Sequence, residues 1–89
     1  MQIPAIKFRL IFTSKVQKKL DNLPSSDRKQ YNKAFECFAQ YGPAYRSFRT
    51  HRYRCKDGDI WSSSASMVKR FYWRYMEKTS IEVTHIDSH

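Results

Sequence analysis

One stretch near the C-terminal end of the chain, 67–75, combines basic and aromatic side chains. If it forms a β-strand, its alternating side chains point to opposite faces of a sheet. One face would carry a first set of side chains, Phe71, Trp73 and Tyr75. The opposite face would carry a second set, Arg70, Tyr72 and Arg74. Guanidinium groups bind phosphate oxygens in bidentate fashion, and a tyrosine ring can stack on a nucleobase. We therefore expect the first set to join a core and the second to present a surface that attracts an anion.

The charge of the whole chain points to the same class of ligand. Its 89 residues include 17 lysines and arginines against 8 acidic residues, for a formal charge of +9. Such an excess predicts nucleic acid, an acidic protein or an anionic membrane surface as partner. The N-terminal segment is interrupted by Lys7 and Arg9, so it is not expected to be a signal peptide, and no stretch has the length of a transmembrane helix.

Three histidines, His51, His85 and His89, could act as general acid or base near neutral pH. His85, Asp87 and His89 alternate along one expected strand, but three such positions spread over roughly 13 Å at the rise of a strand. We therefore expect no metal site and no cofactor. Two cysteines stand far apart without metal-ligand spacing, which indicates free thiols in a reducing cytoplasm.

The apolar pattern predicts the elements that position these residues. Alternation over 5–12 predicts a strand, spacings of three and four predict helices over 15–23 and 25–41, and Gly42-Pro43 ends the second helix. Strands are expected over 46–56, 60–65, 67–75 and from about residue 81, with a hairpin turn at Asp57-Gly58. The serine tract 62–66 is expected at a solvent-facing strand edge, and Trp61 and Trp73 in the core.

This order of elements predicts a single α+β domain over 1–89. An N-terminal strand and a two-helix antiparallel hairpin precede a four-strand antiparallel meander, and the helices pack on one face of the sheet. The other face is left to solvent or to a ligand, with Arg70, Tyr72 and Arg74 central on it.

Four stretches in this order resemble the RelE/ParE superfamily of toxins from toxin–antitoxin pairs. They are Phe12-Thr13-Ser14-Lys15-Val16-Gln17-Lys18-Lys19-Leu20 with Leu23-Pro24, Phe48-Arg49-Thr50-His51-Arg52-Tyr53-Arg54 before Asp57-Gly58-Asp59-Ile60-Trp61, Lys69-Arg70-Phe71-Tyr72-Trp73-Arg74, and His85-Ile86-Asp87-Ser88-His89. The resemblance implies two helices on an antiparallel sheet and a toxin that a protein antitoxin wraps and silences. Members similar to RelE cut mRNA, often in the ribosomal A site, and members similar to ParE inhibit DNA gyrase.

The resemblance also implies roles for individual residues. Arg70 matches an active-site arginine of the penultimate strand, and His89 matches a histidine late in the final strand, with His85 as second choice. These residues would serve a metal-independent attack by the RNA 2′-hydroxyl, in a toxin whose partners are mRNA, the ribosome and an antitoxin rather than a membrane or a small-molecule substrate. The residues expected to bind the RNA are Arg46, Arg49, His51, Arg52, Arg54, Lys56, Tyr72 and Arg74.

Other interpretations compete with this one. Arg70 and Arg74 also fit a role in solvating the open face or in contacting an antitoxin carboxylate. A ParE-like gyrase inhibitor would share the fold without RNA chemistry. A degenerate member would only bind its antitoxin, and the serine tract and the ending at His89 support that alternative.

Overall fold

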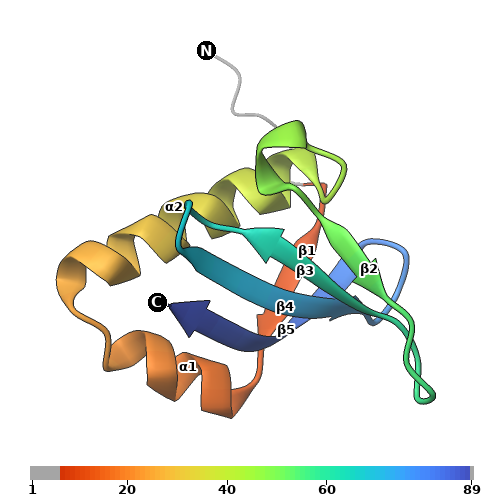
Figure 1. The fold of residues 1–89 in the computed structure, drawn as a ribbon, viewed down its shortest axis with the longest axis horizontal. Helices are drawn as coiled ribbons and strands as arrows, with labels where there is room; N and C mark the ends of the chain where they lie inside the picture. Colours follow the sequence, from red (N-terminus) through yellow and green to blue (C-terminus); the bar gives the residue numbers. More distant parts are fainter. Residues whose placement is uncertain (1–6, 89) are drawn as a thin grey trace.

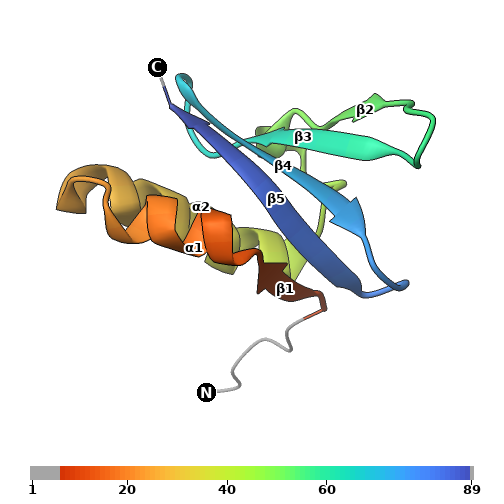
Figure 2. The same ribbon diagram turned by 90° about the horizontal axis from the view of Figure 1, so that it is seen from below.

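The computed structural model describes residues 7–88, which form one five-stranded sheet with two helices on one side (Figures 1 and 2). The elements in chain order are β1 (Arg9–Phe12), α1 (Ser14–Asp21), α2 (Ser25–Tyr41), the 3-10 helix η1 (Arg46–Phe48), β2 (His51–Tyr53), β3 (Ile60–Ser64), β4 (Lys69–Tyr75) and β5 (Ser80–Ser88). The strands lie in the order β1-β5-β4-β3-β2. β1 runs parallel to β5, and the strands from β2 to β5 form the antiparallel meander that the sequence predicts.

The two helices begin and end where the local signals place them. The Thr13 hydroxyl accepts a hydrogen bond from the Val16 amide and so caps α1. α2 ends at Tyr41, and the next residue, Gly42, has a φ of 82° that suits glycine. A Cβ on Gly42 would also overlap the Phe8 ring, so glycine is required there for space as well. Neither helix in the described part of the chain is long and apolar enough to cross a membrane.

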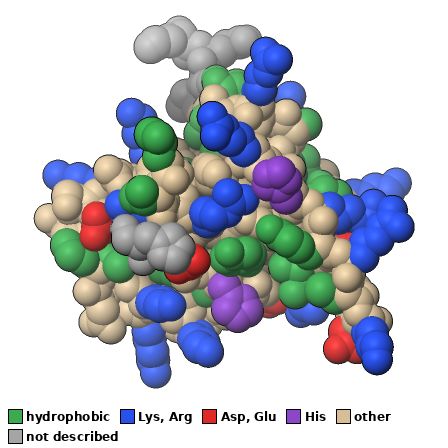
Figure 3. Space-filling view, viewed as in Figure 1, with side chains coloured by type: hydrophobic (Ala, Val, Ile, Leu, Met, Phe, Trp, Pro, Cys, Tyr) green, Lys and Arg blue, Asp and Glu red, His purple; other side chains and the backbone are tan. Residues whose placement is uncertain are grey.

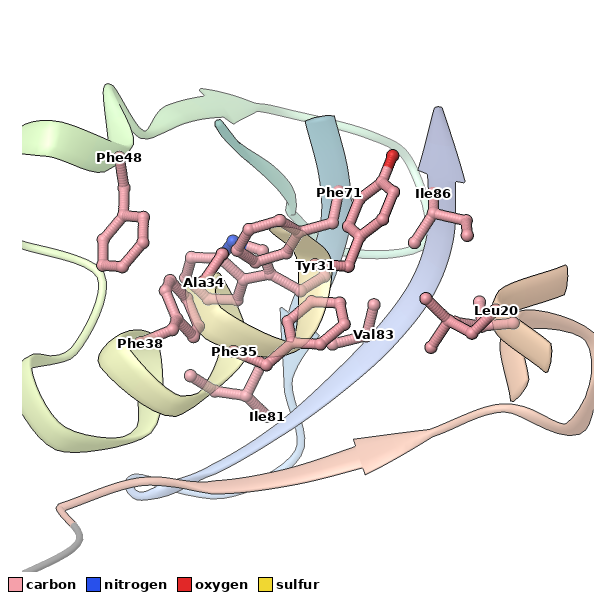
Figure 4. Packing of buried hydrophobic residues seen from close by; sticks show 12 residues of the cluster. Leu20, Tyr31, Ala34, Phe35, Phe38, Phe48, Phe71, Ile81, Val83 and Ile86 are labelled. Carbon is pink, nitrogen blue, oxygen red and sulfur yellow. The ribbon is translucent and has the colours of Figure 1, made fainter. Parts of the chain in front are cut away.

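The core lies between the helices and the sheet and consists largely of aromatic rings. Phe38 of α2 meets Phe48, Phe71 and Trp73 edge-on, with ring centroids 5.1 to 5.3 Å apart. Figure 4 shows the rings of α2 pointing toward β4 and β5. Edge-to-face pairs of this kind add about 0.5–1.5 kcal/mol each beyond the burial of their area. α2 therefore packs on β4 largely through aromatic rings.

A β-bulge in β5 decides which of its residues face the core. Tyr72 pairs with His85, but the next residue, Trp73, pairs with Val83, so Thr84 is the extra residue. Val83 and Ile86 are both buried although they lie three residues apart. Without the bulge, strict alternation would turn His85 toward the core. The bulge instead exposes His85 on the face opposite to the helices.

Several expectations about strand limits were wrong. The segment 46–56 is not one strand, because 46–48 form η1, which turns the Phe48 ring onto Phe38, and only His51–Tyr53 pair with β3. The expected strand 67–75 begins at Lys69. Tyr75 does not join the core, since it is 44% exposed. In the first strand only Arg9–Phe12 pair, and residues 5 and 6 lie outside the described residues.

The serine tract was also misjudged. β3 lies between β2 and β4, so it is not an edge strand. Ser62 and Ser63 are fully buried rather than facing solvent. Small side chains are needed here because the neighbouring strand carries Arg70 and Trp73, whose large side chains lie over the serines.

Candidate functional site

One face of the sheet carries no helix, and strand register shows which residues share it. Directly paired residues project to the same face of a sheet. The rows across this open face are Ser64, Arg70 and Asp87, then His51, Ser62, Tyr72 and His85, and then Arg74 with Glu82. Figure 3 looks onto this face and shows histidine, basic and hydrophobic side chains next to one another. The sequence-based placement of Arg70, Tyr72 and Arg74 on one face is confirmed.

Arg70 is held in place by two serines. Its Nε donates to the Ser62 hydroxyl at 2.9 Å, and one terminal nitrogen donates to the Ser64 hydroxyl at 3.4 Å. The side chain is half-buried. A guanidinium has five N–H donors, so these bonds leave other donors for an anion while they restrict the orientation of the group. Arg70 is therefore a positioned cation rather than a freely moving one.

Sequence reasoning missed the two serines that position Arg70. The signal was present, because residues directly across from one another on adjacent strands contact each other. Small hydroxyl residues at alternate positions of β3 face the large cationic and aromatic residues of β4. The intervening Ser63 points the other way, accepts a hydrogen bond from Trp73 Nε1 at 2.9 Å and pairs with the Thr50 hydroxyl at 2.8 Å.

Beneath Arg70, Tyr31 of α2 joins β4 and β5. Its hydroxyl donates to the backbone carbonyl of Asp87 at 2.8 Å, and the carbonyl of Arg70 lies 3.3 Å away. Burial raises the pKa of Tyr31 to about 12, and the carboxylates of Asp87 and Asp27 act in the same direction. The phenol thus stays protonated and keeps donating. Tyr31 falls within the helix predicted over 25–41, and its role in fixing the site strands depends on the tertiary structure.

Two hollows lie on the open face. The first, of about 400 Å³, is lined by Ile60, Tyr72, His85, Ile86 and Asp87. The Tyr72 and His85 rings meet edge-to-face, 6.4 Å apart, and His85 is exposed. An aromatic, partly apolar surface of this kind suits a nucleobase. His85 Nδ1 lies 3.0 Å from the Thr84 hydroxyl, which orients the ring.

The second hollow, of about 260 Å³, is polar and is lined in part by Ser47, Arg49, Ser64, Ser66 and Arg70. Arg49 occupies the left-handed backbone region, with φ of 45° and ψ of 54°. It caps η1 there and lines the same hollow as Arg70. Two guanidinium groups around one small polar hollow form a natural site for phosphate.

The other predicted contacts are spread over the molecule. Arg52 points to the opposite face, where it lies 5.4 Å from the centre of the Trp61 ring and forms an ion pair with Asp59. Arg74 is on the open face but forms an ion pair with Glu82 at 2.9 Å.

The remaining basic and histidine positions lie in separate parts of the chain. Arg54 and Lys56 lie exposed between β2 and β3, and Arg46 lies in η1. His51 is exposed on the open face, across from Ser62. His89 lies outside the described residues, so its catalytic role stays a prediction. Within 7–88, no three side chains of the metal-binding types come together as a metal site.

Comparison with known proteins identifies the fold. No protein-family model matches the chain, and no curated protein matches its sequence. Among solved structures, a chain of the archaeal RelE–RelB complex from Pyrococcus horikoshii superimposes with a TM-score of 0.74 at 12% identity, over 93% of this chain and 96% of that one. The chain has the fold of the RelE and YoeB toxins.

Two further structures agree. The YoeB dimer from Staphylococcus aureus matches with a TM-score of 0.70 at 9% identity, over 93% of this chain and 98% of that one. The toxin–antitoxin complex RelBE2 from Mycobacterium tuberculosis matches with a TM-score of 0.67 at 19% identity, over 94% and 100%. The RelE-like fold thus spans nearly the whole of this chain and of each neighbour.

Proposed function

We propose that this protein is the toxin of a toxin–antitoxin pair and that it cleaves mRNA at the ribosome in the cytoplasm. The observation that carries the proposal is Arg70, which Ser62 and Ser64 hold half-buried on the open face of a RelE-like sheet. Next to it, one hollow suits a base and the other a phosphate. The net charge of +9 favours binding to the RNA backbone.

The proposed reaction is an internal attack in RNA. The 2′-oxygen forms a bond to the adjacent phosphorus, the bond from phosphorus to the 5′-oxygen breaks, and the products end in a 2′,3′-cyclic phosphate and a 5′-hydroxyl. A base takes the proton of the 2′-hydroxyl and an acid gives one to the 5′-oxygen. Arg70 would stabilise the negative charge that builds on the phosphate oxygens.

His85 is our first candidate among the described histidines for the proton transfers. It lies on the open face, paired with Tyr72, which is two residues along β4 from Arg70 and faces the same way. The Tyr72 ring beside it would stack on a base and so set the distance between His85 and the phosphate. His51 is on the same face, and His89 remains the candidate that the family resemblance implies.

A protein antitoxin is the proposed partner. The Pyrococcus horikoshii structure is a RelE–RelB complex, and a Staphylococcus aureus structure with a TM-score of 0.69 at 9% identity is a YoeB–YefM complex. A cationic toxin surface would attract an acidic antitoxin segment, which would cover Arg70 in the silenced state.

The test is induction of the protein in cells without its partner, with mapping of mRNA 5′ ends. Induction should arrest growth and produce new mRNA ends. Arg70→Ala should abolish both because the phosphate loses its positioned cation, and Arg70→Lys should restore little because lysine lacks the planar fork. Lys29→Ala, which removes one exposed charge on α2, is the matched control and should remain toxic.

Two outcomes would contradict the proposal. A fully toxic Arg70→Ala protein would show that the open-face cation is not needed. Altered plasmid supercoiling with unchanged mRNA ends would indicate a ParE-like action on gyrase instead. Purified protein and a short RNA then separate direct cleavage from an effect that requires the ribosome.

A further inference from the structure

A third hollow, with aromatic walls, lies on the side of the sheet that faces the helices, beyond the end of α2. It has a volume of about 360 Å³ and is lined by Tyr45, Arg46, Thr50, Trp61 and Tyr75, together with the backbone turn after α2. Strand alternation places Trp61 and Tyr75 on the face opposite to Arg70 and Tyr72. A ligand here would not occupy the proposed cleavage site.

The aromatic rings of this hollow are held in place and yet remain open to solvent. The Trp61 ring forms the floor of the hollow. It stacks on Trp73, with ring centroids 5.3 Å apart and ring planes 12° apart, and this contact holds it in place. Tyr75 stands nearly perpendicular to Trp61 at 5.8 Å and is 44% exposed. Tyr45 stacks on Tyr41 at 4.9 Å and is 41% exposed. Two exposed rings on a rigid indole floor are a preorganised stacking surface, and preorganisation lowers the entropic cost of binding.

The charge around the hollow indicates the class of ligand. Arg46 lines it and is exposed, and within the described part of the chain no carboxylate forms an ion pair with Arg46. Arg52 lies over Trp61 beside the hollow, with its charge partly neutralised by Asp59. Aromatic platforms next to an arginine that no carboxylate neutralises are features with which proteins bind single-stranded nucleic acid, because every base has a π-face and every nucleotide a phosphate.

We propose that this hollow binds an unpaired nucleobase of single-stranded RNA, with Arg46 contacting the neighbouring phosphate. The site is separate from the open face and goes beyond the proposed cleavage. It would allow one RNA strand to be held on the reverse of the sheet while another segment of the same strand reaches Arg70. Because duplex RNA keeps its bases stacked and paired, the hollow should discriminate against it.

The experiment uses the full chain with Arg70→Ala, so that RNA stays intact and failure of the cleavage proposal does not affect the readout. A short labelled single-stranded RNA is titrated by fluorescence anisotropy, and the same sequence as a duplex serves as the ligand control. Tyr75→Leu removes the ring but keeps apolar bulk, and should weaken single-strand binding roughly tenfold. Tyr75→Phe keeps the ring and should bind within about twofold of the parent.

A separate variant, Arg46→Ala, tests the phosphate contact. Arg46→Ala should weaken binding and reduce the slope of log affinity against log salt by about one. Base stacking near Trp61 should also quench tryptophan fluorescence, and Tyr75→Leu should reduce that quenching. Thermal melting of each variant confirms that the fold is retained.

Three results would overturn the proposal. Equal affinity of Tyr75→Leu and Tyr75→Phe would show that stacking is not involved. If Arg46→Ala lost affinity for the duplex and for the single strand equally, the loss would be a general charge effect. If Tyr75→Leu bound RNA normally but escaped neutralisation by the antitoxin, the surface would be a protein contact instead.

Discussion

The two faces of β4 carry alternate residues of one strand, and the side chains on the two faces have different surroundings. On the helix face, Phe71 and Trp73 are fully buried and contact several rings of α2. On the open face, Arg70 is half-buried and held by two serine hydroxyls. Packing on the first face stabilises the fold, whereas the second face orients a charge. Substitutions one residue apart on β4 should therefore have separate effects, one on the stability of the fold and one on function.

The largest expected effect tests the packed face. Phe71→Ala removes a fully buried ring that contacts Phe35, Phe38 and Phe48, and should lower the free energy of unfolding by about 3–5 kcal/mol. Arg70→Ala, one residue away, should change it by less than about 1 kcal/mol. Urea unfolding followed by circular dichroism measures the free energy of unfolding of both variants. Equal losses would show that the two faces of β4 contribute equally to stability.

The next effect concerns Tyr31 of α2, whose hydroxyl contacts the backbone carbonyls of Arg70 and Asp87 from the helix side. Since the folded state raises the pKa of Tyr31 from 10.0 to about 12, it holds the phenolic proton more tightly than the unfolded chain does. This stabilisation is fully present below pH 10 and is lost as the pH rises to about 12, with a total of roughly 3 kcal/mol. Tyr31→Phe should flatten this part of the pH profile. Parent and variant profiles that fall in parallel would show that other groups cause the loss.

A smaller effect compares adjacent serines of β3. Ser63→Ala leaves the buried Trp73 Nε1 without its acceptor and should cost about 1–3 kcal/mol of stability. Ser62→Ala removes a hydrogen bond from Arg70, which stays accessible to water, and should cost less than about 1 kcal/mol. RNA cleavage should show the reverse order, because Ser62, unlike Ser63, bonds to the guanidinium of Arg70. Urea midpoints and cleavage rates of the two variants check both halves of this prediction.

The smallest effect is expected at the exposed end of the open face. Arg74 and Glu82 form a surface ion pair at 2.9 Å, and such pairs contribute about 0.2–1 kcal/mol. A double-mutant cycle with Arg74→Ala and Glu82→Ala measures the coupling, which should decrease in high salt. A coupling above this range would mean that the open face also contributes to stability.

Much of the fold was predictable because its signals are local. The apolar spacings of α1 and α2, the glycine that ends α2 and the alternation along β4 each depend on residues close in sequence. The segment 46–56 was not predictable in the same way. Its basic and aromatic residues fit a strand locally, but burial of Phe48 against Phe38 favours a 3-10 turn there. Tyr75 likewise fits an alternating core pattern, yet it lies beyond the rings of α2 that cover Phe71 and Trp73.

The sequence alone determined the fold class, the order of the elements, and the placement of Arg70, Tyr72 and Arg74 on one uncovered face, because these follow from local periodicity. Only the tertiary structure decided that Ser62 and Ser64 hold Arg70, that the bulge at Thr84 exposes His85, and that Arg49 reaches the same hollow as Arg70. These relations join residues from different strands and loops, and they depend on strand register. Register follows from how the whole core packs, so it is not encoded at any single position.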